Sequence, residues 1–100
     1  MRHLIFDVSD GDNGSCVLEA VASTQAAAHP DVMAEVQQVL DWAEQQVPGA
    51  HGPLEDGFVW DHALLVHVEA GGWVTVSLTL AVTAQAAPEF AARLGHDALA

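Results

Sequence analysis

The sequence predicts an α+β fold, a two-layer sandwich in which a four-stranded, mainly antiparallel sheet carries one long helix on one face. Three observations predict it. Four segments alternate apolar and polar residues with the two-residue period of a strand. A fifth segment repeats its apolar residues at helical spacing, and the order of the elements along the chain is ββαββα. One hundred residues suffice for a single domain, residues 1–100, around one core.

The first two strands are predicted over HLIFDV, residues 3–8, and SCVLEAVAST, residues 15–24. The residues expected to be buried are even-numbered in both segments. Because directly paired residues point to the same face, the two residue numbers of each pair must add up to an even number, and the loop between the strands must have an odd length. A three-residue loop, 12–14 with Gly14 in the left-handed region, satisfies this rule, and so does a five-residue loop, 10–14. The pattern leaves both loops open.

The choice of loop decides which residue lies opposite Asp7. The three-residue loop places Asp7 opposite Glu19, where two carboxylates repel each other and favour a bound cation. The five-residue loop places Asp7 opposite Val17, which carries no charge.

The loop itself has the composition of a calcium site, because DVSDGDNGS, residues 7–15, holds three aspartates, an asparagine and two glycines. An EF-hand requires acids at positions 1, 3 and 5, glycine at 6 and glutamate at 12. Counting from Asp10 puts Gly14 at position 5 and Val21 at position 12, and no helices flank the loop. The composition therefore indicates a turn, since Asp, Asn and Gly tolerate left-handed backbone angles.

The long helix is predicted over HPDVMAEVQQVLDWAEQQVPG, residues 29–49. Pro30 suits the first helical position, Asp31 and Glu35 suit the positive end of the helix dipole, and Pro48-Gly49 ends the helix. A stripe about 100° wide faces the core. It consists of Val32, Val36, Val39, Leu40, Ala43 and Val47.

The second half of the chain repeats the strand–turn–strand pattern. Residues 49–57 are turn formers and predict a loop. Residues 58–69 and 73–85 alternate most clearly and predict strands joined by Ala70-Gly71-Gly72. A short helix is predicted over PEFAARLG, residues 88–95, with its proline near the start and its glycine as the cap.

Parity also sets the second hairpin, in which Val68 pairs with Val74 and Val66 with Val76 across an odd turn that contains glycine. The long helix returns the chain, so the second and third strands run in the same direction. An all-antiparallel sheet then needs the strand order 2-1-3-4 or 1-2-4-3, and the sequence leaves both open.

Charge is the anomaly in the composition. Fourteen acidic residues face only two strong bases, Arg2 and Arg93, and the formal net charge is −12. Without a basic cluster we expect no nucleic-acid binding, and repulsion also disfavours anionic membranes. The charge would attract a basic protein segment or a cation, or it serves solubility alone.

Cys16 is the single cysteine, so no internal disulfide or thiolate zinc site is expected, and its apolar neighbours predict a buried thiol. The apolar run near the amino terminus is three residues long, far too short for a signal peptide, and no segment is long enough to cross a membrane. We therefore expect a cytoplasmic protein.

The outward, odd-numbered face of the sheet holds the candidate metal ligands. His67 and Glu69 lie two apart on one predicted strand, close enough to share a metal ion. A third ligand, His3 or Asp7, would come from another strand. His62 points to the other face and is expected to be a hydrogen-bonded histidine at the edge of the core.

The same face is too apolar to be only solvated, which favours a second packing partner. The interface candidates on the face are Ile5, Val17, Val21, Leu65 and Trp73. Trp42 would extend this surface, because it lies about 120° from the centre of the helical stripe and is expected at the rim or outside.

These features together predict a small acidic protein-interaction domain, adaptor-like or chaperone-like, that forms a homodimer and meets a basic or amphipathic segment of another protein. Small acidic dimeric secretion chaperones, such as those of type III systems, are similar in general form. The alternative is a small metal-binding protein or enzyme using His67, Glu69 and His3. No cofactor is expected, and the sequence has no tyrosine, no lysine, no nucleophile elbow and no phosphate loop.

Overall fold

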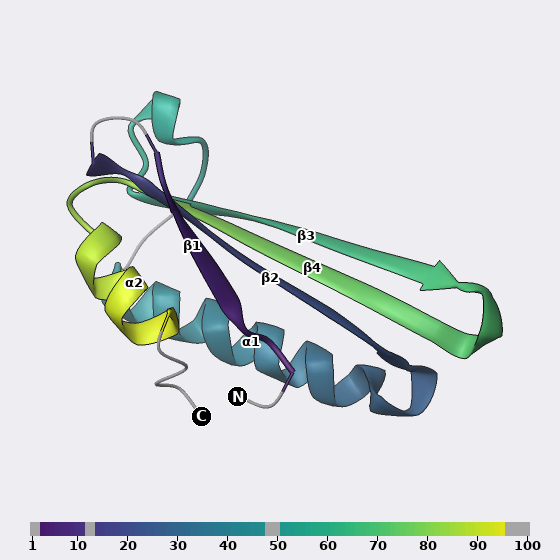
Figure 1. The fold of residues 1–100 in the computed structure, drawn as a ribbon. Helices are drawn as coiled ribbons and strands as arrows, with labels where there is room; N and C mark the ends of the chain where they lie inside the picture. The colour runs from purple at the N-terminus through teal and green to yellow at the C-terminus, as the bar shows by residue number, and fades with distance from the viewer. Residues whose placement is uncertain (1–2, 12–13, 48–50, 96–100) are drawn as a thin grey trace.

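The computed structural model describes residues 3–11, 14–47 and 51–95 and has the predicted order ββαββα (Figure 1). The strands and main helices are β1 (Phe6–Asp10), β2 (Cys16–Gln25), α1 (His29–Gln46), β3 (Trp60–Glu69), β4 (Trp73–Val82) and α2 (Ala87–Leu94). Three single turns of 3-10 helix accompany them: η2 (Ala26–Ala28), η3 (Leu54–Asp56) and η4 (Ala70–Gly72). The predicted α+β class is confirmed.

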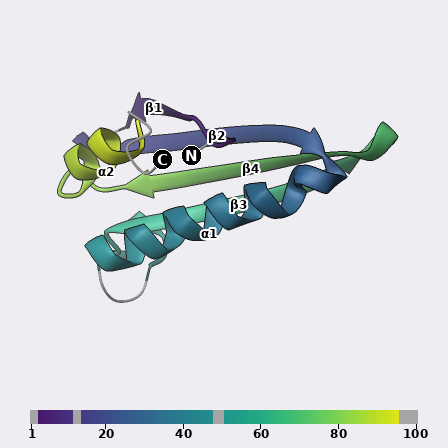
Figure 2. The same ribbon diagram turned by 90° about the horizontal axis from the view of Figure 1, so that it is seen from below.

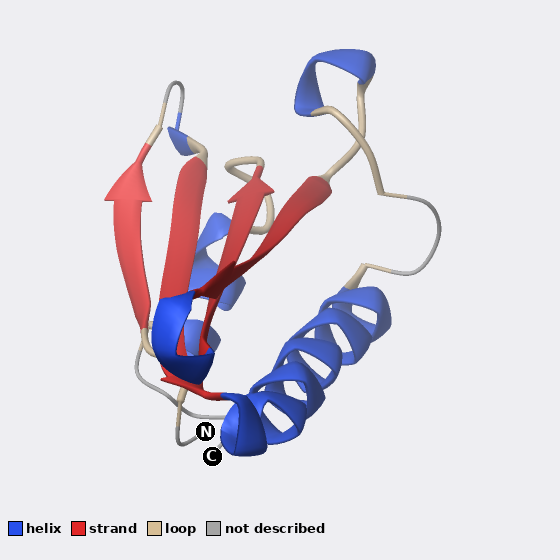
Figure 3. Ribbon diagram, turned by 90° about the vertical axis from the view of Figure 1, so that its right-hand side faces the viewer, coloured by secondary structure: helices blue, strands red, loops and turns tan. Residues whose placement is uncertain are grey.

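The four strands form one antiparallel sheet in the order β1-β2-β4-β3, one of the two orders that the sequence left open (Figure 3). β4 therefore lies between the two strands that run in the same direction, and the edges of the sheet are the short β1 and the ten-residue β3. The central position suits β4, because all five of its even-numbered residues are buried.

The first hairpin has the register of the three-residue loop. Gly11 N–H donates to the Ser15 carbonyl at 2.8 Å, Asp7 lies opposite Glu19, and Gly14 has φ +82°. The alternative register, with Asp7 opposite Val17, is wrong. Asp12 and Asn13 lie outside the described residues.

The second hairpin confirms the parity rule, because Val68 pairs with Val74 and Val66 with Val76. The turn between these strands needs two left-handed residues, Gly71 at φ +81° and Gly72 at φ +82°. Only glycine adopts this conformation without a steric cost, so the Gly-Gly pair fixes the position of the turn and with it the register.

Both main helices cover the even face of the sheet, α1 against β2 and β4 and α2 against β2 (Figure 2). Pro30 lies in the first turn of α1 and Pro88 in the first turn of α2, as predicted. The core between helices and sheet is apolar. Its largest fully buried side chains are Trp60, Phe90, Leu4, Leu18, Leu78, Leu80 and Leu94.

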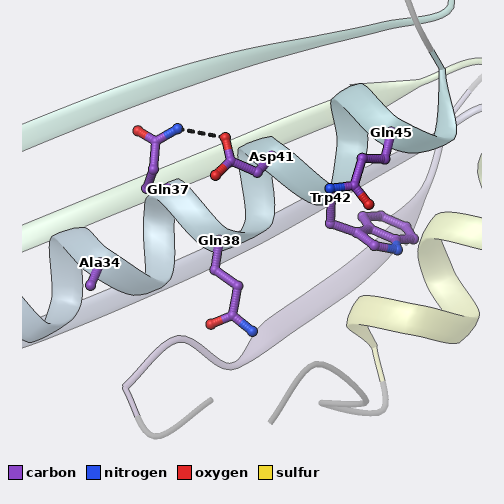
Figure 4. Close-up of a pocket in the computed structure, with 6 residues that line it drawn as sticks. All are labelled: Ala34, Gln37, Gln38, Asp41, Trp42 and Gln45. Carbon is purple, nitrogen blue, oxygen red and sulfur yellow. Dashed lines mark hydrogen bonds between the residues drawn. The ribbon is translucent and has the colours of Figure 1, made fainter.

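Trp42 is buried, so the prediction that it lies at the rim or outside is wrong. Only 8% of the residue is exposed, and its ring packs edge-on against Phe90 of α2 at a centroid distance of 4.9 Å. Figure 4 shows the indole pointing from α1 toward α2. The second helix widens the core on this side of α1, while Leu40 on the other side is only partly buried. Its burial removes the reason for expecting Trp42 at an interface.

Glu35, which the sequence assigned only to the positive end of the helix dipole, is also buried. Its carboxylate accepts the backbone N–H of His3 at 3.0 and 3.1 Å and that of Leu4 at 3.0 Å. These hydrogen bonds stabilise the segment before β1, where the backbone N–H of the fully buried Leu4 needs an acceptor.

Candidate functional site

The outer edge of β3 is the candidate site. Backbone groups of an edge strand alternate between the neighbouring strand and the outside. The Trp60 carbonyl points outward, where it accepts the Gly52 N–H at 3.1 Å, and the His62 N–H points outward to Asp61 Oδ1 at 2.8 Å. By the same alternation the backbone groups of Leu64, Val66 and Val68 also point outward. Within the described residues these three have no backbone partner on that side.

The side chains along this edge are apolar and exposed on both faces. Leu65, on the odd face, is 71% exposed, while Val66 and Val68, on the even face, are 47% and 74% exposed. The parity pattern predicts that the two valines are buried on the core side of the sheet. They are exposed instead, because neither helix packs on this end of β3. Figure 1 shows the tip of the β3–β4 hairpin separating from α1.

The rest of the odd face is open but divided. Ile5, Val17, Val21 and Trp73 are exposed, as predicted, but they are distributed over β2, the end of β4 and the segment before β1. Polar pairs separate them. In the first pair the hydroxyl oxygens of Ser23 and Thr75 lie 3.0 Å apart. In the second pair the Thr79 hydroxyl donates to Glu19 Oε2 at 3.5 Å.

The metal ligands suggested by the sequence do not meet. His67 and Glu69 are exposed on β3, and His3 precedes β1 at the opposite edge of the sheet. Two strands separate these edges, which corresponds to roughly 14 Å at the usual strand spacing. The structure therefore gives no support to a metal site formed by His67, Glu69 and His3.

A different group of ionisable residues does converge where β3 begins. His51 lies against His62, with ring centroids 4.7 Å apart, and beside Asp61. Burial, followed by the nearby His51, lowers the pKa of His62, and the Asp61 carboxylate acts in the opposite direction. Within the described residues His62 Nδ1 is buried and has no hydrogen-bond partner, which differs from the expectation of a hydrogen-bonded histidine. No sequence pattern indicates this contact, because His51 lies in a loop without periodicity.

Two further features lack catalytic chemistry. Cys16 is buried, as predicted, and burial together with Asp10 across the hairpin raises the pKa of its thiol, so the reactive thiolate is disfavoured. A shallow hollow on α1 is lined by Ala34, Gln37, Gln38, Asp41, Trp42 and Gln45 (Figure 4). Its one ionisable side chain, Asp41, accepts a hydrogen bond from Gln37 Nε2 at 2.8 Å.

Comparison with protein family models, curated proteins and solved structures finds no match for the chain. No helix in the described residues is long and apolar enough to cross a membrane. The unpaired, apolar edge of β3 is suited to binding another strand.

Proposed function

We propose that the protein is a protein-interaction domain that forms a homodimer by pairing the β3 edge of one chain with the β3 edge of a second. The observation that carries the proposal is the edge from Leu64 to Val68, where unpaired backbone groups coincide with exposed apolar side chains on both faces. Proteins usually protect such an edge with charge, proline or a covering element, and this stretch has none of these among the described residues.

A two-fold axis at Val66 gives the best pairing of two such edges. Leu64 then lies opposite Val68 of the second copy, so all even-face pairs are apolar and both chains exchange their outward backbone hydrogen bonds. Moving the centre to Leu65 would place Asp61 opposite Glu69 of the second copy, where like charges repel. The centre at Val66 avoids that contact.

The upstream end of β3 is already occupied, which limits the paired segment. The Gly52 N–H donates to the Trp60 carbonyl, and the Asp61 carboxylate accepts the His62 N–H. An added strand can therefore pair only from Leu64 onward. The result is a continuous eight-stranded sheet with the two even faces on the same side of the sheet.

A second candidate occupant is a basic or amphipathic strand from another protein, and the net charge of −12 favours it. The two occupants differ in their response to salt. Two chains of equal charge repel, so homodimers should tighten as salt rises, whereas a complex with a basic segment should weaken.

The experiment is sedimentation equilibrium at 50 and 500 mM NaCl for wild type and two proline variants. Val66→Pro removes an outward N–H and should abolish the dimer without breaking the β3–β4 ladder. Val8→Pro is the matched control, because Val8 is a half-exposed valine whose N–H points away from β2 on the other edge. The proposal fails if both variants behave alike.

A further inference from the structure

His51, Asp61 and His62 bring two imidazoles and a carboxylate together where β3 begins. One ring nitrogen from each histidine and one carboxylate oxygen all lie within 4.8 Å of one another, and all three side chains are partly exposed. Residues of this kind are ordinary ligands of a transition metal, and a partly exposed position leaves them open to an ion from solvent.

The fold positions each of the three. The Gly52 N–H donates to the Trp60 carbonyl at 3.1 Å, which fixes the loop carrying His51 against β3. The His51 ring then lies 4.7 Å from the Trp60 ring and 4.7 Å from the His62 ring. Asp61 belongs to the other face by parity, but its carboxylate accepts the outward His62 N–H at 2.8 Å. The carboxylate therefore lies at the outer side of the start of β3, within reach of both histidines.

The surroundings favour a cation. His62 Nδ1 is buried and has no hydrogen-bond partner among residues 3–11, 14–47 and 51–95, which is an unfavourable state for an imidazole nitrogen without a ligand. Glu44 Oε1 lies 3.7 Å from His51 Nδ1, and Asp41 lines the same hollow between α1 and β3. A carboxylate behind a histidine ligand is the usual arrangement at zinc sites, because it orients the ring.

We propose that His51, Asp61 and His62 form a zinc-binding site. Two nitrogens and one carboxylate oxygen suit Zn²⁺, whereas Mg²⁺ and Ca²⁺ prefer oxygen ligands alone. Ligand atoms at about 2.05 Å from a tetrahedral ion lie about 3.3 Å apart, so a side-chain movement on the order of 1 Å completes the set. The fourth position is open to water.

This site does not depend on the proposed dimer, because its residues lie upstream of the free edge. A bound ion would connect the loop that carries His51 to the start of β3. In the described residues these two segments are joined by one backbone hydrogen bond, from Gly52 to Trp60, and by ring contacts. We therefore expect zinc to strengthen the attachment of His51 to the start of β3.

The test is calorimetric titration of ZnCl₂ into the chelator-treated protein, with MgCl₂ as the comparison ion. We expect one zinc ion per chain, no heat from magnesium, and affinity at least about 100-fold lower in His51→Ala and His62→Ala, since loss of a ligand costs more than loss of an outer carboxylate. His67→Ala is the matched control, because it removes an exposed histidine from the same strand and should leave the affinity unchanged.

Imidazole nitrogen NMR spectra of the wild type provide a readout that does not depend on the folding of any variant. Zinc should shift the ring nitrogens of two of the six histidines, and His51→Ala should identify one of them. The proposal is overturned if 1 mM zinc shifts no histidine, or if His51→Ala binds zinc as tightly as the wild type, or if His67→Ala is the variant that loses binding.

Discussion

Replacing Glu35 tests whether a buried carboxylate holds the amino-terminal segment in the fold. Its two oxygens receive the backbone N–H groups of His3 and Leu4 at 3.0 to 3.1 Å, and the residue is 9% exposed. In Glu35→Gln one acceptor oxygen becomes an NH₂ group, which cannot accept a hydrogen bond and faces an N–H donor.

The expected cost follows from these contacts. A hydrogen bond to a charged group contributes about 1.5–3 kcal/mol, compared with about 0.5–1.5 kcal/mol for a bond to a neutral group. The remaining oxygen of Glu35→Gln can still accept both N–H groups, but the charge and the second contact to His3 are lost, so we expect about 2 kcal/mol of lost stability, which lowers Tm by about 10 °C in a chain of this size.

The assay is urea unfolding followed by circular dichroism, at fixed protein concentration because dimerisation couples to stability. Glu44→Gln on the same helix is the matched control; its carboxylate is half-exposed, so with EDTA present we expect a change within about 0.5 kcal/mol. If Glu35→Gln is as stable as Glu44→Gln, the Glu35 contacts do not hold this segment.

Three further predictions concern the sheet. Leu65→Glu should weaken the dimer about tenfold or more, because it places a charge beside the apolar edge. Ile5 is equally exposed at the opposite edge, so Ile5→Glu should leave the dimer unchanged. Loss of the dimer in both variants would indicate face-to-face packing instead. Asp7→Asn should raise stability by about 0.5 kcal/mol at low salt and less at 1 M NaCl, because it relieves repulsion with Glu19; unchanged thermal melts would contradict this. The Cys16 thiol should react with iodoacetamide at pH 8 far more slowly in the native state than in guanidinium, because burial raises its pKa; equal rates would show an accessible thiol.

Local periodicity predicted the elements and the register of the second hairpin, and it limited the first hairpin to two registers, because side-chain alternation and turn glycines are properties of short segments. Gly14, Gly71 and Gly72 occupy the left-handed positions that the odd loops require. The order of the strands was narrowed to two, since antiparallel pairing and a helical return exclude the others, but the choice between them depends on contacts between distant segments.

The errors have a common physical cause, which is packing between elements. Trp42 is buried because α2 lies beside α1, and no property of the α1 sequence encodes that position. Val66 and Val68 are exposed because the hairpin tip separates from the helix, although their parity is that of core residues. His51 reaches His62 through a loop, where sequence spacing carries no geometric information.

Pairing of the β3 edge with a second copy is tested by sedimentation equilibrium of the wild type and Val66→Pro. At micromolar concentration and 500 mM NaCl we expect the wild type at twice the 10.5 kDa chain mass and Val66→Pro at the mass of one chain. Val8→Pro should remain a dimer under the same conditions. A wild type that stays at 10.5 kDa up to about 100 μM, where even weak edge pairing would be populated, would contradict the account.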